Sequence, residues 1–304
     1  MDSAVVKGVA TNHLSMEWTK LKTLGKGSFA IVHLVKPTNS VSDDQVFAMK
    51  SCLYQLSSSL QKEQKILKRF FPCRNIVQCY GDMLSCEQGA VVYNLFLEYA
   101  PGGSLLDLIN NKYGGKVPEC DARCYARILV EGVRDIHERG YVHCDLKPGN
   151  VLVYPSDEYG SVSSLKIADF GLAEQPGERV DEPGVDPWML KFPGTAVYMP
   201  PEGINYKKIS ASMDIWSLGC IVLQMVTGKL PWEYEDLTDL AIQLGSRRYS
   251  PKISENMSST GQDFLSKCFV RDPSERWTAD MLLSHPFVLP DRPSVAISNK
   301  ASSP

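Results

Sequence analysis

The sequence predicts an α+β fold with two lobes, a small β-rich lobe followed by a larger helical one. The first third of the chain contains short segments rich in β-branched and aromatic residues, separated by turn-forming residues, as is typical of strands. A Pro-Gly-Gly turn at 101–103 marks a change, and beyond it apolar residues recur at helical spacing. With 304 residues, of which 43% are hydrophobic, the chain can bury a substantial core.

Composition and charge exclude several classes of function. Lys and Arg total 32 against 35 for Asp and Glu, so we expect no nucleic-acid partner bound through bulk positive charge. No apolar run reaches the length of a secretory leader or a membrane span, so we expect no membrane insertion. Nine cysteines in such a chain are expected to stay reduced, which predicts a cytoplasmic or nuclear location.

The folded body is expected to span about residues 18–287. Residues 1–17 predict a flexible N-terminal extension, and residues 288–304, rich in Pro and Ser, predict a flexible tail. A ligand site is expected at the junction of the lobes, because pockets favour domain interfaces. The predicted divisions of the body are a small lobe at about 18–97, a hinge at about 98–103 and a larger lobe at about 104–287.

The small lobe is predicted to hold strands interrupted by one helix. Residues Ser58 and Gln61 have the spacing of a capping box, and apolar residues then follow at helical spacing as far as Phe71-Pro72, where a helix should stop. The segments with strand character are 21–27, 30–37, 45–53, 75–83 and 90–100.

Two helices dominate the pattern of the larger lobe. Residues 123–140 place their apolar side chains on one face and end at Gly140, a residue suited to a helix C-terminus. Residues 211–228 are apolar on nearly all sides for about fourteen residues, too short for a bilayer and typical of a helix at the centre of a domain.

A glycine-rich turn lies between the first two predicted strands of the body. Glycines there would let backbone amides approach phosphate oxygens, although a purely structural hairpin remains an alternative. A strand rather than a helix follows the glycines, which excludes a dinucleotide-binding fingerprint. The residues of this candidate phosphate-binding segment are Leu24, Gly25, Lys26, Gly27, Ser28, Phe29, Ala30, Ile31 and Val32.

Lys50 and Glu63 form a candidate ion pair beside this turn. Lys50 ends an apolar strand, where its ammonium can meet a phosphate and a carboxylate. Glu63 shares a helix face with Leu60 and Leu67, which directs its carboxylate toward the core. A solvated lysine and an exposed glutamate are the alternatives that these two residues alone leave open.

An ordered series of motifs follows in the larger lobe. It includes His143-Cys144-Asp145-Leu146-Lys147-Pro148-Gly149-Asn150, Asp169-Phe170-Gly171, the block at 194–202, the run at 214–219 and Glu275-Arg276-Trp277. Together these segments resemble the eukaryotic protein kinase family over roughly residues 18–287. The resemblance implies the bilobal protein kinase fold and transfer of a phosphoryl group from ATP.

The resemblance also implies the role of each polar residue. Asp145 would accept the proton of the substrate hydroxyl, and Lys147 would contact the γ-phosphate. Lys50, held by Glu63, would bind the α- and β-phosphates. Asn150 and Asp169 would supply oxygen ligands to Mg²⁺, because this ion prefers a few protein oxygens together with phosphates and waters.

The adenine site and a structural ion pair are implied in the same way. The Glu98 carbonyl and the Ala100 amide would bind the edge of adenine, while Glu202 and Arg276 would form a buried ion pair that anchors the end of the activation segment. The residues implied to enclose the adenine ring are Leu24, Val32, Ala48 and Leu152, with Leu97 at the back.

Lys147 and the block at 194–202 resemble serine/threonine kinases, in which Thr195 would contact Asp145. Within them, the chain is similar to plant mitogen-activated protein kinase kinase kinases of the MEKK type, especially short members. This implies a MAP kinase kinase as the protein substrate, phosphorylated on its activation segment in stress or hormone signalling. The alternative is a pseudokinase scaffold without catalysis, but such scaffolds generally lose one of four residues that are all present here: Lys50, Asp145, Asn150 and Asp169.

Three departures from the family pattern bear on regulation. Cys144 stands where an Arg usually receives the phosphate of the activation loop, and no Ser, Thr or Tyr lies between Asp169 and Gly194. We therefore expect activity without phosphorylation of this loop. Ala30 replaces the last glycine of the turn, which predicts a modest change in nucleotide affinity. Acidic residues expected to hold the loop, unless they are merely solvated, are Glu178, Asp181, Glu182 and Asp186.

Overall fold

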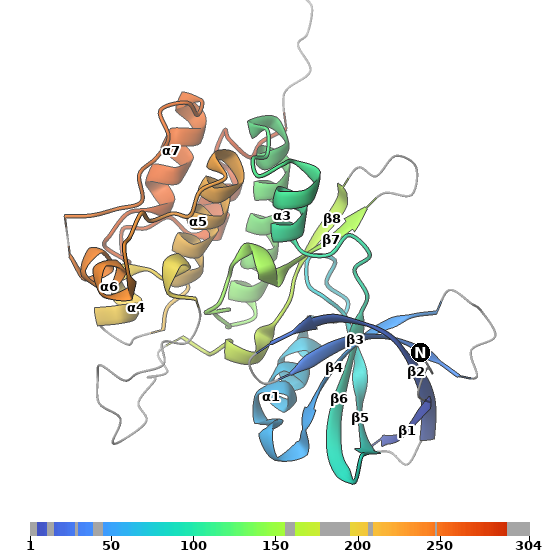
Figure 1. The fold of residues 1–304 in the computed structure, drawn as a ribbon. Helices are drawn as coiled ribbons and strands as arrows, with labels where there is room; N and C mark the ends of the chain where they lie inside the picture. The colour runs from blue at the N-terminus through green and yellow to red at the C-terminus, as the bar shows by residue number, and fades with distance from the viewer. Residues whose placement is uncertain are drawn as a thin grey trace, which may run out of the picture.

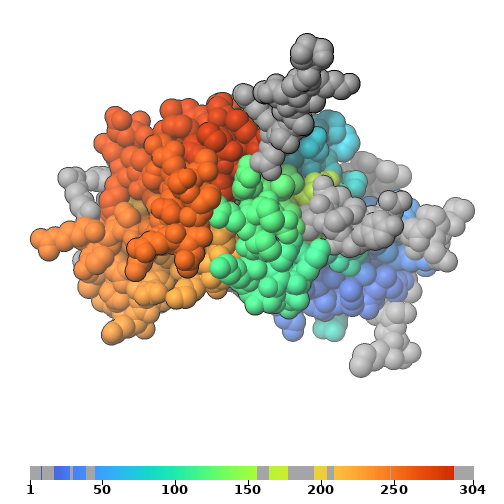
Figure 2. All heavy atoms as spheres, turned by 90° about the horizontal axis from the view of Figure 1, so that it is seen from above, coloured from blue at the N-terminus to red at the C-terminus, as the bar shows by residue number. Residues whose placement is uncertain are grey.

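The structure is a computed structural model of the whole chain, and two lobes are evident in it (Figure 1). A sheet and helix α1 form the small lobe, and helices form most of the larger one, which confirms the predicted α+β class. Figure 2 shows, from a second direction, the green middle of the chain between the blue small lobe and the orange and red residues of the larger lobe. The residues that the structure describes are 5–10, 15–27, 30–38, 45–155, 162–176, 195–205, 209–246 and 248–290.

The sheet of the small lobe closes on itself. Its strands are antiparallel and run in the order β1-β2-β3-β4-β6-β5, with β1 also paired to β5. Strands β4 and β6 carry Lys50 and Glu98 and are paired from Phe47↔Glu98 to Leu53↔Val92, so the sheet fixes both residues. The strands are β1 Val5–Ala10, β2 Ser15–Lys26, β3 Ile31–Pro37, β4 Phe47–Leu53, β5 Cys79–Glu87 and β6 Ala90–Glu98.

The prediction of a flexible extension over residues 1–17 is wrong for most of that stretch. Strand β1 pairs with the start of β2 and, at Gly8↔Ser85, with β5, which is far away in sequence. Gly8 is needed because a Cβ there would lie 2.2 Å from the buried ring of Trp18. At the other end Val288 is still buried, so the body extends beyond 287, while the tail at 291–304 lies outside the described residues.

Helix α1, Ser58–Leu67, is the predicted helix of the small lobe. Its N-cap is Ser57 rather than Ser58, and the side-chain amide of Gln61 donates to the Ser57 hydroxyl at 2.7 Å. No side-chain hydrogen bond caps the helix at Ser57, so the predicted capping box of Ser58 and Gln61 is wrong. Glu63 faces inward with Leu60 and Leu67, as the helical pattern predicted.

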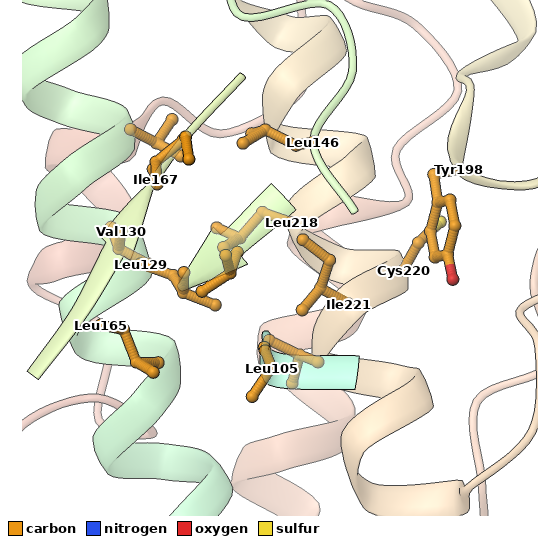
Figure 3. Packing of buried hydrophobic residues seen from close by; sticks show 14 of the residues in the cluster. Leu105, Leu129, Val130, Leu146, Leu165, Ile167, Tyr198, Leu218, Cys220 and Ile221 are labelled. Atoms are coloured by element: carbon orange, nitrogen blue, oxygen red, sulfur yellow. The ribbon is translucent and has the colours of Figure 1, made fainter. Parts of the chain in front are cut away.

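Helices α3, Glu119–Glu138, and α5, Ser212–Thr227, form the centre of the larger lobe. Helix α5 is buried from Met213 to Val226, and Gly140 after α3 has the positive φ of a helix terminator. Side chains of α3, α5 and strand β8 meet in one core (Figure 3). The remaining elements are α2 Leu105–Asp107, β7 Val151–Pro155, β8 Val162–Ile167, α4 Pro201–Asn205, α6 Leu237–Gly245, α7 Ser259–Cys268 and α8 Ala279–Leu283.

The hinge is held against strand β7 by its backbone. The amide of Gly102 donates to the Val153 carbonyl at 3.1 Å, and the Val153 amide donates to the Gly103 carbonyl at 2.9 Å. The approach is so close that a Cβ on Gly102 would lie 2.6 Å from the Val153 oxygen. The two glycines thus set where the chain crosses from one lobe to the other.

Among the described residues, no helix is both long and apolar enough to cross a membrane.

Candidate active site

Lys50, Glu63 and Asp169 meet at the junction of the lobes. The Lys50 Nζ lies 2.7 Å from Glu63 Oε2 and 3.0 Å from Asp169 Oδ1. Glu63 is fully buried, and its second oxygen accepts the backbone N–H of Phe170 at 3.2 Å. The predicted Lys50–Glu63 pair is present, and it is tied to the segment that carries Asp169.

The charges of this cluster support one another. Burial acts to lower the pKa of Lys50, but the carboxylates of Glu63 and Asp169 outweigh it and raise that pKa. Burial likewise acts to raise the pKa of Asp169, and the Lys50 ammonium reverses the effect and lowers it. Burial raises the pKa of Glu63 against the opposing effect of Lys50. The Lys50 ammonium and the Asp169 carboxylate are therefore both charged at neutral pH.

The carboxylate of Asp145 is fixed by donors on both oxygens. Its Oδ2 accepts from the Lys147 ammonium at 2.6 Å and from the Asn150 amide at 3.0 Å. Its Oδ1 accepts from the backbone N–H of Thr195 at 2.8 Å and from the Thr195 hydroxyl at 3.2 Å. The expected contact between Thr195 and Asp145 is thus present. A carboxylate held in this way is preorganised to orient a hydroxyl nucleophile.

The loop that carries Asp145 is held by a buried carboxylate of the central helix. Asp214 is 1% exposed, and its oxygens accept the backbone N–H groups of His143 at 2.8 Å and Cys144 at 3.1 Å. His137 contacts the same carboxylate at 2.9 Å. The sequence motif contained Asp214 but did not reveal this function. A single acid within an otherwise apolar helix was the available signal.

The residues expected to bind a cation lie on two segments that the fold brings together. The Asn150 amide nitrogen donates to the carbonyl and the carboxylate of Asp145, which leaves its oxygen as the donor atom for a cation. Asp169 has a positive φ of 67° and a side chain that is 45% exposed. An amide oxygen and a carboxylate suit a hard divalent cation whose other ligands are phosphates and waters. In the described part of the chain no cluster of three or more His, Cys, Asp or Glu offers another metal site.

The apolar residues expected around adenine lie at the junction of the lobes. Ala48 and Leu97 are buried and opposite each other on β4 and β6, and Val32 and Leu152 pack, half-buried, against the same core. Leu24 is 38% exposed and lies next to Gly25, which pairs with Val32. The glycine-rich turn is closed by a hydrogen bond from the Gly27 amide to the Ala30 carbonyl at 2.8 Å. Within this turn, Lys26 and Ile31 are exposed, Ala30 is buried, and Ser28 and Phe29 lie outside the described residues.

Glu98 at the hinge is engaged through its side chain. The Lys166 ammonium lies 2.5 and 2.8 Å from its two oxygens, and the Lys166 charge also lies 4.8 Å from the centre of the Tyr154 ring. The carbonyl of Glu98 and the amide of Ala100 therefore stay the groups that we predict to bind adenine. Sequence reasoning missed Lys166, since its partner is 68 residues away.

The expected structural ion pair is present in the larger lobe. The Arg276 guanidinium donates to both oxygens of Glu202, at 2.5 and 3.1 Å, and the two side chains are 0% and 5% exposed. Glu202 lies in the first turn of α4, the helix after the Thr195 segment, so the pair ties that segment to the C-terminal part of the lobe.

Comparisons with known proteins agree with this geometry. The model of the protein kinase domain matches residues 18–288. Mitogen-activated protein kinase kinase kinase 20 of Arabidopsis thaliana is 38% identical over 91% of this chain and 79% of its own length. Kinase kinase kinases 17 and 18 of the same plant are 38% and 34% identical, over 90% and 95% of this chain and 70% and 82% of their own lengths.

A protein kinase domain implies ATP and a divalent cation, and the Lys50, Asp145, Asn150 and Asp169 groups assembled here fit both. The chain belongs to the protein kinase family and is a serine/threonine protein kinase, similar to plant MAP kinase kinase kinases.

Proposed function

We propose that this kinase acts as a MAP kinase kinase kinase that phosphorylates the activation segment of a MAP kinase kinase with Mg-ATP. The observation that carries the proposal is the complete set of Lys50, Asp145, Asn150 and Asp169, with Lys50 bonded to Asp169 and Asn150 bonded to Asp145, on a chain similar to kinases with that name. We extend the proposal to signalling in plant stress or hormone responses, as the resemblance to kinases of the MEKK type implies, and to a location in the cytoplasm or nucleus, where thiols stay reduced.

The arrangement supports phosphoryl transfer by positioning and charge. Asp145 would accept the proton of a substrate hydroxyl and orient its oxygen, and Lys147 beside it would face the transferred phosphate. Lys50 would neutralise the other phosphates, with Glu63 keeping it in place. Bound at Asn150 and Asp169, Mg²⁺ would neutralise charge on the phosphate oxygens. The low exposure of Asp145, 8%, strengthens the interactions that its own carboxylate makes.

The regulatory part of the proposal concerns the activation segment. Thr195 is the first hydroxyl residue after Asp169, and its hydroxyl is bonded to Asp145 and to Lys147 at 2.8 Å. The Thr195 hydroxyl is therefore part of the active site, and its role there does not require phosphorylation. The acidic residues Glu178, Asp181, Glu182 and Asp186, expected to hold the loop, lie outside the described residues. We propose that activity survives phosphatase treatment. Loss of activity that is traced to dephosphorylated Thr195 would overturn this.

The function is tested by transfer of labelled phosphate from Mg-ATP onto a panel of catalytically inactive plant MAP kinase kinases. Asp145→Asn is the control, because it keeps the size of the side chain but removes the carboxylate that would accept the proton of the substrate hydroxyl. Transfer to Ser or Thr of an activation segment that disappears in the control supports the proposal. Binding of ATP without transfer to any member would instead favour the scaffold.

A further inference from the structure

One face of helix α1 contacts the beginning of the activation segment at three points. The Ser59 hydroxyl donates to the Gly171 carbonyl at 3.4 Å, Lys62 Nζ lies 2.5 Å from Glu174 Oε1, and Glu63 accepts the Phe170 amide. Residues 59, 62 and 63 are three and four positions apart, so they share one helix face. The contact at Gly171 is close, since a Cβ there would lie 2.6 Å from the Ser59 oxygen.

Glu174 is fixed to the catalytic loop as well as to the helix. Its backbone amide donates to the Val142 carbonyl at 2.9 Å, and the Val142 amide donates to the Glu174 carbonyl at 2.8 Å. Val142 is fully buried and comes three residues before Asp145. The Lys62–Glu174 ion pair therefore connects α1, through the backbone of residue 174, to the loop that carries the catalytic aspartate.

The charges around Cys144 are unsuited to a phosphate. Cys144 donates its thiol to the Val142 carbonyl at 3.5 Å, and burial, together with the carboxylates of Asp214 and Glu174, raises its pKa, so the thiol is neutral. Lys62, the cation whose charge acts to lower the pKa of the Cys144 thiol, is already paired with Glu174. A phosphate at this place would meet two carboxylates and would have to displace one of them from Lys62.

We propose that the Lys62–Glu174 ion pair holds α1, and with it Glu63, in the position for phosphoryl transfer without any phosphate on the activation segment. Lys62 and Glu174 are positioning residues, since they act through Glu63 and the catalytic loop. The ion pair links two segments of the chain by charge, as a phosphate on the activation loop would. This proposal rests on the chain being an active protein kinase, and it does not depend on which protein is the substrate.

The test is a double-mutant cycle on the full chain, treated with phosphatase, with Lys62→Ala, Glu174→Ala and the double variant. Each side chain of the pair is 35% exposed, so water screens it, and we expect each single change to act by about two- to fivefold. The first readout is hydrogen exchange of the α1 amides, because it reports the opening of the helix even where the closed state dominates. The second is the rate of phosphate transfer to dephosphorylated casein at saturating and at low Mg-ATP.

The expected result is faster exchange in α1 for both single variants, no further increase in the double variant, and restoration in the swapped variant Lys62→Glu/Glu174→Lys. Transfer at low Mg-ATP should fall with the same pattern. Lys65→Ala on the exposed side of α1 is the matched control and should change neither readout. Additive effects in the double variant, or exchange equal to that of the control, would overturn the proposal. Failure of the kinase function itself would be distinguishable, because the unmutated chain would then transfer no phosphate.

Discussion

Removal of either partner of the Arg276–Glu202 ion pair should unfold the larger lobe at much lower denaturant concentration. The Arg276 guanidinium has other partners in addition to the Glu202 carboxylate. It also donates to the carbonyls of Val270 and Ser212, both at 2.8 Å, and its carbon lies 5.0 Å from the centre of the Trp216 ring. Burial is nearly complete on both sides, so no water can replace a lost partner.

The two single changes should differ in cost. Arg276→Met fills the space but leaves a buried carboxylate and two carbonyls without their donor, which should cost about 3–5 kcal/mol. Glu202→Gln keeps one acceptor for the guanidinium, which retains both carbonyl partners, and should cost about 2–3 kcal/mol. Glu233→Gln is the matched control, because Glu233 is 91% exposed and 3.9 Å from Lys229; its cost should be below about 0.5 kcal/mol.

Equilibrium unfolding in urea measures these differences. Circular dichroism and tryptophan fluorescence should follow the same transition, which is the condition for a two-state free energy. The reasoning is refuted if Arg276→Met costs less than Glu202→Gln, or if both remain as stable as the Glu233→Gln control.

Four further predictions test other parts of the structure. Lys50→Met should lower the rate of phosphate transfer by about 10²–10³-fold, since one fixed charge at the phosphates is lost; a rate within tenfold of the unmutated rate would contradict its role. In alkylation of the native protein at pH 8, mass spectrometry should find Cys144 labelled more slowly than the exposed Cys86, Cys120 and Cys124, because burial raises the pKa of Cys144 and leaves little thiolate; labelling of Cys144 first would be inconsistent with this. Mg²⁺ should increase the thermal stabilisation by ATP in the unmutated chain, and Asp169→Asn should lose that increment; an unchanged increment would remove Asp169 from the cation site. Gly8→Val should cost about 1–3 kcal/mol in urea unfolding, because its Cβ would overlap the Trp18 ring; unchanged stability would argue against β1 in this position.

Local patterns predicted the main elements and the central residues of the site. The helical spacing of Leu60, Glu63 and Leu67 was sufficient to direct Glu63 inward, because a helix face is set by residues three and four apart. The position of Asp145 followed from its motif, since its partners Lys147 and Asn150 are two and five residues away. Where the partners are close in the chain, spacing alone predicts the contact.

Contacts between segments that are distant in the chain were not predicted from the sequence. Strand β1 was missed because its second partner, β5, begins near residue 79, and a six-residue stretch carries too little alternation to predict such a pairing. Lys62 and Glu174 are 112 residues apart, and each reads as an ordinary surface charge. The role of Asp214 was missed for the same reason, since its partners at 143 and 144 are about seventy residues away.

The two anchors of the site differ in how firmly they are set. Asp214 lies in the buried helix α5 and accepts two backbone hydrogen bonds from the catalytic loop, with a third contact from His137 of α3, so Asp145 is held by the core of the larger lobe. Lys50 depends instead on Glu63, whose helix is tied to the activation segment by contacts that include a pair one-third exposed to solvent. Charge pairs of that kind respond to salt, to a competing charge and to a bound partner, whereas a buried carboxylate does not. A regulator of this kinase should therefore act on α1 and change the position of Lys50, while the geometry around Asp145 stays the same.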